Sequence, residues 1–346
     1  MPKARSSNLE LYRIIVMLLI VAHHYVVNSG LMDVMAESPL SGRSIFFYLF
    51  GAWGKTGINC FLMITGYFMC TSQITVRKFL KLLLEVEFYK ITIYAIFLLS
   101  GYETFSVPGC IRSVVPMLSL TDGFVSCFLV FYLCIPFLNI LVHNMDRRTH
   151  GLLIVLCLFI YTVHCTVPYT TVTMNYVSWF CVIYFIASYI RFYENVLSNV
   201  KWWAVLCILV SIASIIYRLK KGYCSDVEVY YYISDSNALM SVLTSVCTFM
   251  FFKDLHIKYN KLINTIGSST FGVLLIHANS DTMRQWLWRD TLDNVGHYAD
   301  GLFWLRPIIA VCAIFTICVI IDRLRAHFIE NPIFRIIDKR INDESI

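Results

Sequence analysis

The sequence predicts an all-α fold, a polytopic membrane bundle of about ten transmembrane helices that forms one domain over residues 1–346. Two observations carry this prediction. Of the 346 residues, 58% are hydrophobic and only 14% are charged, whereas soluble proteins carry about 25% charged residues. Apolar runs of about 18–25 residues, long enough to cross a bilayer as a helix, recur along the whole chain with short polar stretches between them.

The apolar runs define the expected spans in order. The second run is interrupted by the glycines of residues 51–57, so we expect a short interfacial helix there, followed by a shorter span. The ten expected spans cover residues 9–28, 45–70, 76–101, 122–143, 150–167, 176–194, 201–217, 233–252, 262–287 and 302–323.

An even number of spans places both chain ends on the same side of the membrane. With that side cytoplasmic, the inner loops hold roughly twice as many Lys and Arg residues as the outer loops, as the positive-inside rule requires. The sequence therefore predicts an N-in/C-in orientation. The basic stretch 218–221 falls in an outer loop and leaves the sidedness of the seventh and eighth spans open.

The first expected span carries ionisable residues inside an apolar helix. Arg13 and His24 are eleven residues apart, a net rotation of only about 20°, so they share one stripe and lie roughly 16 Å apart along the axis. Ionisable groups cost at least ~2.5–3.5 kcal/mol near the middle of a bilayer and normally face a protein interior or a wet cavity. His23 points roughly 100° away from His24. His24 is therefore the histidine that shares the polar stripe with Arg13.

His24 has two interpretations. It is either a structural histidine, bonded to a neighbouring helix or reaching the membrane interface, or the general base of an active site, because imidazole accepts a proton near neutral pH. The stripe shared with Arg13 favours the second. Such a base would take the proton of a hydroxyl acceptor, and a covalent acyl-histidine is the other route. The sequence leaves these two routes open.

A basic cluster, Arg77, Lys78 and Lys81, opens the third span. Basic residues at the cytoplasmic end of a helix are the ordinary topology signal, but several cations together also bind phosphates. Coenzyme A carries phosphates at one end and a thioester at the end of a flexible arm. These residues and Arg13 are therefore candidates for binding an acyl-CoA donor whose thioester reaches His24.

Five further polar residues are candidates for the acceptor side of the cavity. His277, Asp281 and Arg284 follow at i, i+4 and i+7, which places them on one face of a continuous ninth span. Lys55 and Asn59 are one helical turn apart beside the glycine-rich break.

Other residues suggest structural roles. Glu85 and Lys90 are expected to pair in and around the third span. No metal site is expected, because the thirteen cysteines form no Cys-x-x-Cys pair and most lie in apolar runs, where free cysteine packs as a small hydrophobe. A disulfide between Cys110 and Cys224, both in expected outer loops, is one option that the sequence leaves open.

The order and placement of several fragments resemble the acyltransferase-3 family, integral-membrane acyltransferases of bacteria related to those that O-acetylate surface polysaccharides. The resemblance extends from the first span to the last. The fragments are ELYRIIVMLLIVAHHY at 10–25, FLMITGYF at 61–68, RKFLK at 77–81, FYLCIPFLNIL at 131–141, STFGVLLIH at 269–277 and IDRLRAHFIENPIF at 321–334.

The resemblance implies about ten transmembrane helices in the cytoplasmic (inner) membrane of a bacterium, and transfer from cytoplasmic acyl-CoA to an acceptor at or beyond the outer face. It maps the family's proposed catalytic histidine to His24 and its paired arginine to Arg13. An acidic residue often follows that histidine in the family. Asp33 is the candidate here, as an orienting partner of the imidazole, and Glu37 competes with it.

The family's basic motif maps to Arg77, Lys78 and Lys81. Lysines stand where arginine is common in the family, and lysine cannot make the planar two-point phosphate contact of arginine.

The expected function is transfer of a small acyl group, most simply acetyl, from acyl-CoA to a hydroxyl of a cell-envelope glycan or its lipid-linked precursor. No nucleic-acid partner is expected. One alternative is a secondary transporter or exporter of a small polar solute that uses Arg13, His24, His277 and Asp281 as a path, although the chain lacks the matching halves that many transporters show. Another is a silent membrane module that binds a metabolite. The sequence does not specify the acceptor, the acyl chain or the oligomeric state.

Overall fold

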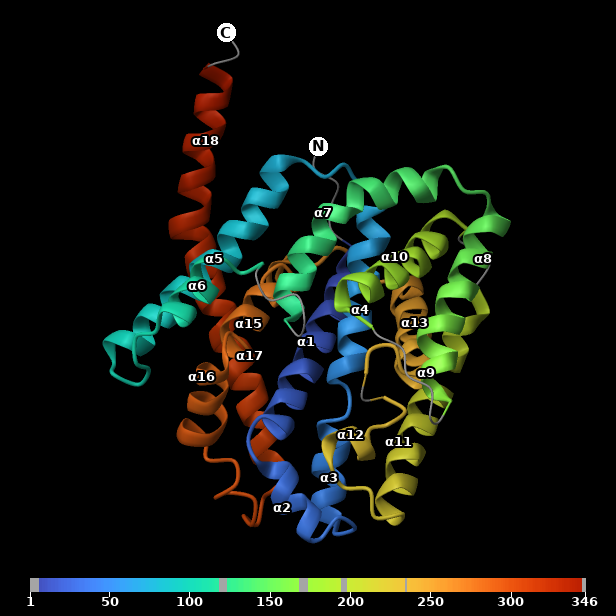
Figure 1. The fold of residues 1–346 in the computed structure, drawn as a ribbon, viewed down its shortest axis with the longest axis vertical. Helices are drawn as coiled ribbons and strands as arrows, with labels where there is room; N and C mark the ends of the chain where they lie inside the picture. Colours follow the sequence, from blue (N-terminus) through green and yellow to red (C-terminus); the bar gives the residue numbers. More distant parts are fainter. Residues whose placement is uncertain (1–5, 118–122, 168–173, 194–197, 234, 344–346) are drawn as a thin grey trace.

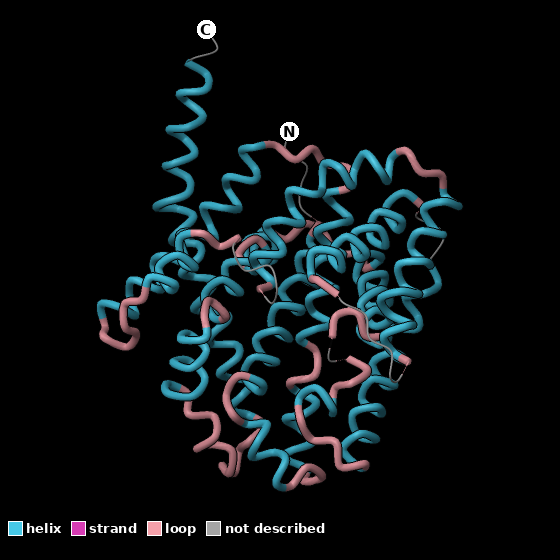
Figure 2. Tube along the Cα trace, viewed as in Figure 1, coloured by secondary structure: helices cyan, strands magenta, loops and turns pink. Residues whose placement is uncertain are grey.

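The computed structural model describes residues 6–117, 123–167, 174–193, 198–233 and 235–343. Within these ranges all regular structure is helical and no strand occurs (Figure 2). The predicted all-α fold is therefore confirmed for the described part of the chain.

The helices follow one another with short connections (Figure 1). Most are α-helices; η1, η3 and η4 are π-helical and η2 is 3₁₀. In chain order they are α1 (Ser7–Val27), α2 (Leu31–Glu37), α3 (Gly42–Phe50), α4 (Gly54–Met69), α5 (Val76–Leu99), α6 (Val107–Val114), α7 (Phe124–His143), α8 (Arg147–Leu158), η1 (Phe159–Val163), α9 (His164–Thr166), α10 (Tyr176–Phe192), η2 (Ser198–Trp203), α11 (Ala204–Lys220), α12 (Asp226–Val229), α13 (Leu239–Asp254), α14 (Lys261–Gly267), α15 (Thr270–His277), α16 (Asp281–Arg284), η3 (Gln285–Thr291), α17 (Leu305–Arg325), η4 (Ala326–Glu330) and α18 (Asn331–Asp343).

Four helical stretches in the described ranges are long and apolar enough to cross a membrane. They are α1, α7, residues Ser198–Lys220 and residues Leu305–Asp338, and the shorter α10 is also apolar. This is the composition of a membrane protein. The number of ten spans and the N-in/C-in orientation stay predictions.

Two expected spans are broken in the structure. The second consists of α3 and α4, separated at residues 51–53, as the glycine-rich interruption predicts. The ninth was expected to be one helix over 262–287, and that expectation is wrong. The segment is divided into α14, α15, α16 and η3, and Ser280 caps the new start at α16 by accepting a hydrogen bond from the backbone N–H of Met283.

α4 packs against α1, α10 and α13 near the middle of the bundle (Figure 1). Glycine permits the close approach of α4 to α1. A Cβ at Gly57 would lie 2.8 Å from Ile20 Cγ1, and one at Gly54 would lie 2.2 Å from His23 Cγ. The glycines that interrupt the second apolar run therefore bring α4 onto the part of α1 that carries the histidine pair.

α17 packs against α1 and α15, and continues through η4 into α18. In Figure 1, α18 extends beyond the rest of the bundle at the end where α5 begins, and α2 and α3 lie at the opposite end. The C-terminal helix therefore lies beside the basic cluster of α5.

Candidate active site

A cavity of about 240 Å³ lies beside His24, between the helices. Met17, Ile20 and His24 line it from α1 at successive turns, on the stripe that Arg13 begins. Phe61 lines it from α4. The remaining lining residues are His23, Gly54, Lys55, Ile58, Lys90, Gly123, Phe124, Val125, Ser126, Tyr176, Leu274, Ala278, Asn279 and Arg284.

The two neighbouring histidines have different environments. His23 is buried, with Nδ1 2.6 Å from the carbonyl oxygen of Gly51, and its ring fills the space that a side chain at Gly54 would need. His24 is half-buried at the cavity, and its Nδ1 lies 3.0 Å from Nε2 of His277. Both histidines line the cavity, but the ring of His23 fills the contact between α1 and α4, whereas the ring of His24 pairs with His277.

The contacts of His277 define the tautomers of the pair. Its Nδ1 lies 2.6 Å from the carbonyl oxygen of Val273, which only accepts, so neutral His277 carries its proton on Nδ1 and presents an unprotonated Nε2. His24 Nδ1 must then donate to that Nε2. Neutral His24 is left with a lone pair on its own Nε2, the nitrogen that makes no hydrogen bond to a described residue. This is the arrangement that a general base requires.

Asp33, expected to orient the imidazole, does not contact it. Asp33 is exposed on α2, as is Glu37, and neither forms a hydrogen bond or ion pair with the described residues. The neighbour of His24 Nδ1 is instead His277, 253 residues away in the sequence. The hydrogen-bond partner of His24 among the described residues is therefore a second histidine and not the expected acid.

The expected face of His277, Asp281 and Arg284 does not exist as one helical stripe, because α15 ends at His277 and α16 begins at Asp281. His277 is fully buried, and Arg284 lines the cavity. The side chain of Asp281 is 97% exposed and accepts from Nη1 of Arg284 at 2.6 Å. Asp281 therefore holds Arg284 from outside the cavity.

Lys55 and Asn59, one turn apart on α4, have different surroundings. Lys55 lines the cavity and donates to the hydroxyl of Tyr176 at 3.0 Å. Asn59 is fully buried away from it, donating to the carbonyl of Ser236 and accepting from Nε1 of Trp179. Its role in the structure is to join α4 to α10 and to the chain segment before α13.

Arg13 lies at the N-terminal end of the stripe. Its Nη1 is 3.1 Å from Oε1 of Glu10, and its guanidinium carbon is 5.6 Å from the ring centroid of Phe61. Because Phe61 also lines the cavity, one aromatic ring separates the arginine from the space beside His24.

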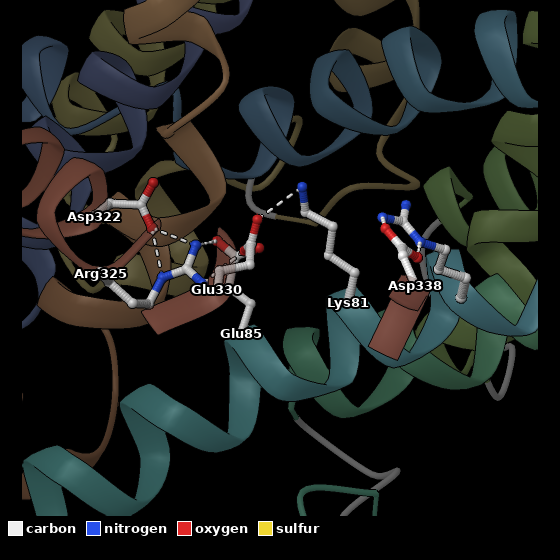
Figure 3. Close-up of polar contacts among 7 residues, drawn as sticks. Lys81, Glu85, Asp322, Arg325, Glu330 and Asp338 are labelled. Carbon is white, nitrogen blue, oxygen red and sulfur yellow. Dashed lines mark hydrogen bonds and ion pairs between the residues drawn. The ribbon is translucent and has the colours of Figure 1, made fainter. Parts of the chain in front are cut away.

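The basic cluster of α5 is engaged by the C-terminal segment. Arg77 donates to both carboxylate oxygens of Asp338, at 2.8 and 2.7 Å, and Lys81 pairs with Glu330 at 2.7 Å. Lys78 donates to the hydroxyl of Ser72 and the carbonyl of Gln73. Two of the three cations therefore already hold carboxylates, as Figure 3 shows for Lys81.

Next to this cluster lies a buried ion cluster that the sequence did not reveal. Arg325 donates to Asp322 at 3.0 Å and to Glu330 at 2.8 Å, and lies 3.3 Å from Glu85 (Figure 3). The expected Glu85–Lys90 pair is wrong, because Lys90 instead donates to the backbone carbonyl of Asn279. The i, i+3 spacing of Asp322 and Arg325 was the available signal for part of this cluster.

Lys90, Tyr176, Ser126 and Asn279 line the cavity but were not expected there. These four residues lie on separate segments, and no spacing in the sequence relates one to another. Only the packing of the helices shows that they share a cavity. No group of three or more His, Cys, Asp or Glu side chains that could hold a metal ion occurs in the described ranges. Cys110 and Cys224 are free thiols, so the disulfide between them is absent.

Comparison with known proteins gives one match. A family model described as an acyltransferase domain, Acyl_transf_3, matches residues 6–323, nearly the whole chain. No match was found among curated proteins or among solved structures. The matched range includes every residue that lines the cavity beside His24.

Proposed function

The chain belongs to the acyltransferase-3 family of membrane O-acyltransferases, and from this premise we propose that it moves a small acyl group from cytoplasmic acyl-CoA to a hydroxyl of a cell-envelope glycan or its lipid-linked precursor. Acetyl is the simplest such group. The observation that carries the proposal is the cavity-facing His24, whose Nδ1 is occupied by His277. Its Nε2 is therefore the nitrogen that can accept a proton.

In the proposed reaction, Nε2 of His24 takes the proton of the acceptor hydroxyl as the oxygen attacks the thioester carbonyl. A new C–O bond forms and the C–S bond breaks. The departing thiolate takes the proton from Nε2, so the products are the ester and free coenzyme A, and His24 returns to its starting state. His277 keeps the ring oriented throughout by accepting from Nδ1.

The donor is proposed to enter from the side of α5 and the start of α1. Arg77, Lys78 and Lys81 would hold its phosphates by charge-assisted hydrogen bonds. Arg13 would act nearer the reacting end, since it lies over Phe61 at the cavity wall. Because Asp338 and Glu330 now pair with these cations, donor phosphates must compete with two carboxylates.

The test is His24→Ala in purified protein reconstituted in nanodiscs. Free coenzyme A is measured from acetyl-CoA, and labelled acetyl is followed into membranes of the source organism that lack this protein. Loss of a general base lowers such rates by roughly 10²–10⁴-fold. His143→Ala is the matched control, because His143 is exposed at the end of α7 and does not line the cavity.

Full activity in a folded His24→Ala protein would remove His24 from the chemistry. Gradient-driven solute uptake into liposomes without release of coenzyme A would support a transporter instead.

A further inference from the structure

The cavity beside His24 has an unbalanced charge. Three cationic side chains line it, Lys55 from α4, Lys90 from α5 and Arg284 from α16. No Asp or Glu side chain is among the described residues that line it. The histidines add no negative charge, so the described residues that line this space are positive or neutral.

The partners of the two lysines do not compensate their charge. Lys55 donates to the phenol hydroxyl of Tyr176 at 3.0 Å, and Lys90 donates to the backbone carbonyl of Asn279. Neither lysine forms an ion pair with any described residue. Asp235 and Asp226 act on Lys55 only from beyond ion-pair distance.

Arg284 has one carboxylate partner and one unsatisfied donor. Its Nη1 donates to Asp281, whose side chain is 97% exposed and does not line the cavity. Its Nε is buried and has no hydrogen-bond partner. A buried guanidinium N–H without an acceptor is unfavourable, and an anionic ligand in the cavity would supply that acceptor.

Electrostatics favours an anion here. Like charges repel more strongly between helices than in water because the local dielectric constant is low, and ionisable residues among membrane helices usually mark a substrate or ion path. Three cations around one small cavity are therefore destabilising when it holds only neutral groups, and each is stabilised by a bound negative charge.

We propose, resting on the acyltransferase function above, that the acceptor is an anion. It carries a carboxylate or phosphate close to the hydroxyl that receives the acyl group, as an acidic sugar unit does. Lys55, Lys90 and Arg284 bind this negative charge and place the hydroxyl at His24. The acceptor's charge, and not only its hydroxyl, then determines specificity.

The donor does not account for these cations. A cavity of about 240 Å³ is below the ~300–1,000 Å³ of pockets that enclose a drug-sized ligand, so a nucleotide and an acceptor do not fit together beside His24. The thioester end of acyl-CoA, which must reach His24, is uncharged. The negative charge in this space therefore belongs to the acceptor.

The test compares Arg284→Gln with Arg284→Lys and with the control Arg289→Gln. Arg289 is exposed on η3 and does not line the cavity. Two quantities are measured in nanodiscs: the half-saturating amount of acceptor membranes, and the KM for acetyl-CoA in acceptor-independent release of coenzyme A. Inorganic phosphate is the competing probe.

We expect Arg284→Gln to raise the half-saturating amount of acceptor roughly 10- to 100-fold, the effect of losing a hydrogen bond between charged groups, with the KM for acetyl-CoA unchanged. Arg284→Lys should raise the half-saturating amount of acceptor by less than Arg284→Gln does, and Arg289→Gln should leave it unchanged. In the parent protein, phosphate should compete with the acceptor and not with acetyl-CoA.

A rise in the KM for acetyl-CoA, or competition between phosphate and acetyl-CoA alone, would assign the cations to the donor and overturn the proposal. Unchanged acceptor dependence in Arg284→Gln would overturn it as well. A parent protein that releases no coenzyme A and labels no membrane would instead refute the acyltransferase function on which the proposal rests.

Discussion

His24 and His277 face each other with Nδ1 and Nε2 3.0 Å apart, which joins the C-terminal part of α1 to the end of α15. The backbone carbonyl of Val273 fixes the proton of His277 on Nδ1. One hydrogen-bonded chain therefore runs from α15 through His277 to His24 and leaves Nε2 of His24 as the basic nitrogen. In the proposed mechanism His24 is the base, and His277 is a positioning residue that orients its ring.

Replacing His277 with leucine removes the acceptor for His24 Nδ1. The His24 ring can then turn or exchange tautomers, so kcat for coenzyme A release should fall by roughly 10²-fold or more, while the KM for acetyl-CoA stays within about two-fold. His277→Gln should recover part of kcat, because its amide oxygen can accept the same hydrogen bond. Equal activity of the leucine and glutamine variants would show that only the volume of the side chain matters.

Gly54→Ala is expected to destabilise the protein and to disturb the cavity. The added Cβ would lie 2.2 Å from His23 Cγ, so α1 and α4 must separate at the level of His24. Overpacking of this kind costs about 1–3 kcal/mol and should lower the thermal denaturation midpoint in detergent. Gly42→Ala is the control, since beyond its chain neighbours and its own helix backbone no atom lies within 4 Å of its Cβ position. A midpoint for Gly54→Ala equal to that of the control would contradict the close helix contact.

The sequence predicted the elements that long apolar runs define. α1, α5 and α7 begin and end within two residues of the expected spans. The break before α16 was missed because the polar residues at 277, 281 and 284 were placed on one continuous helical face. The sequence does contain a signal for the break, since Ser280 is a favoured N-cap residue. The neighbour of His24 could not be predicted, because a contact across 253 residues depends on packing that no local pattern encodes.

Asp322→Asn should be strongly destabilising. Asp322 is buried and accepts from Arg325 at 3.0 and 3.1 Å and from Tyr89 at 2.9 Å. Glu330 and Glu85 still compensate the charge of Arg325 in this variant, but the charged acceptor of three buried hydrogen bonds is lost, and a hydrogen bond to a charged group contributes about 1.5–3 kcal/mol. Asp338→Asn removes an exposed partner of Arg77 and should cost about 1 kcal/mol or less. Chemical denaturation of both variants, followed by tryptophan fluorescence, measures this difference, and comparable losses would contradict it.

The exposed Arg77–Asp338 pair also provides a test of donor binding. Asp338 occupies the guanidinium of Arg77 with two hydrogen bonds, the two-point contact that a donor phosphate would need. Asp338→Asn removes the competing charge, so the KM for acetyl-CoA should fall roughly two- to five-fold at low salt, in proportion to the ~0.2–1 kcal/mol of an exposed ion pair, and the difference should shrink at high salt because the charges are screened. Arg77→Gln should raise KM and abolish the effect of Asp338→Asn in the double variant. Asp146→Asn is the control, since this exposed acid caps α8 away from α5. If neither Asp338→Asn nor Arg77→Gln changes the KM for acetyl-CoA, the donor binds without Arg77. The Arg77–Asp338 pair then serves only to hold α18 against α5.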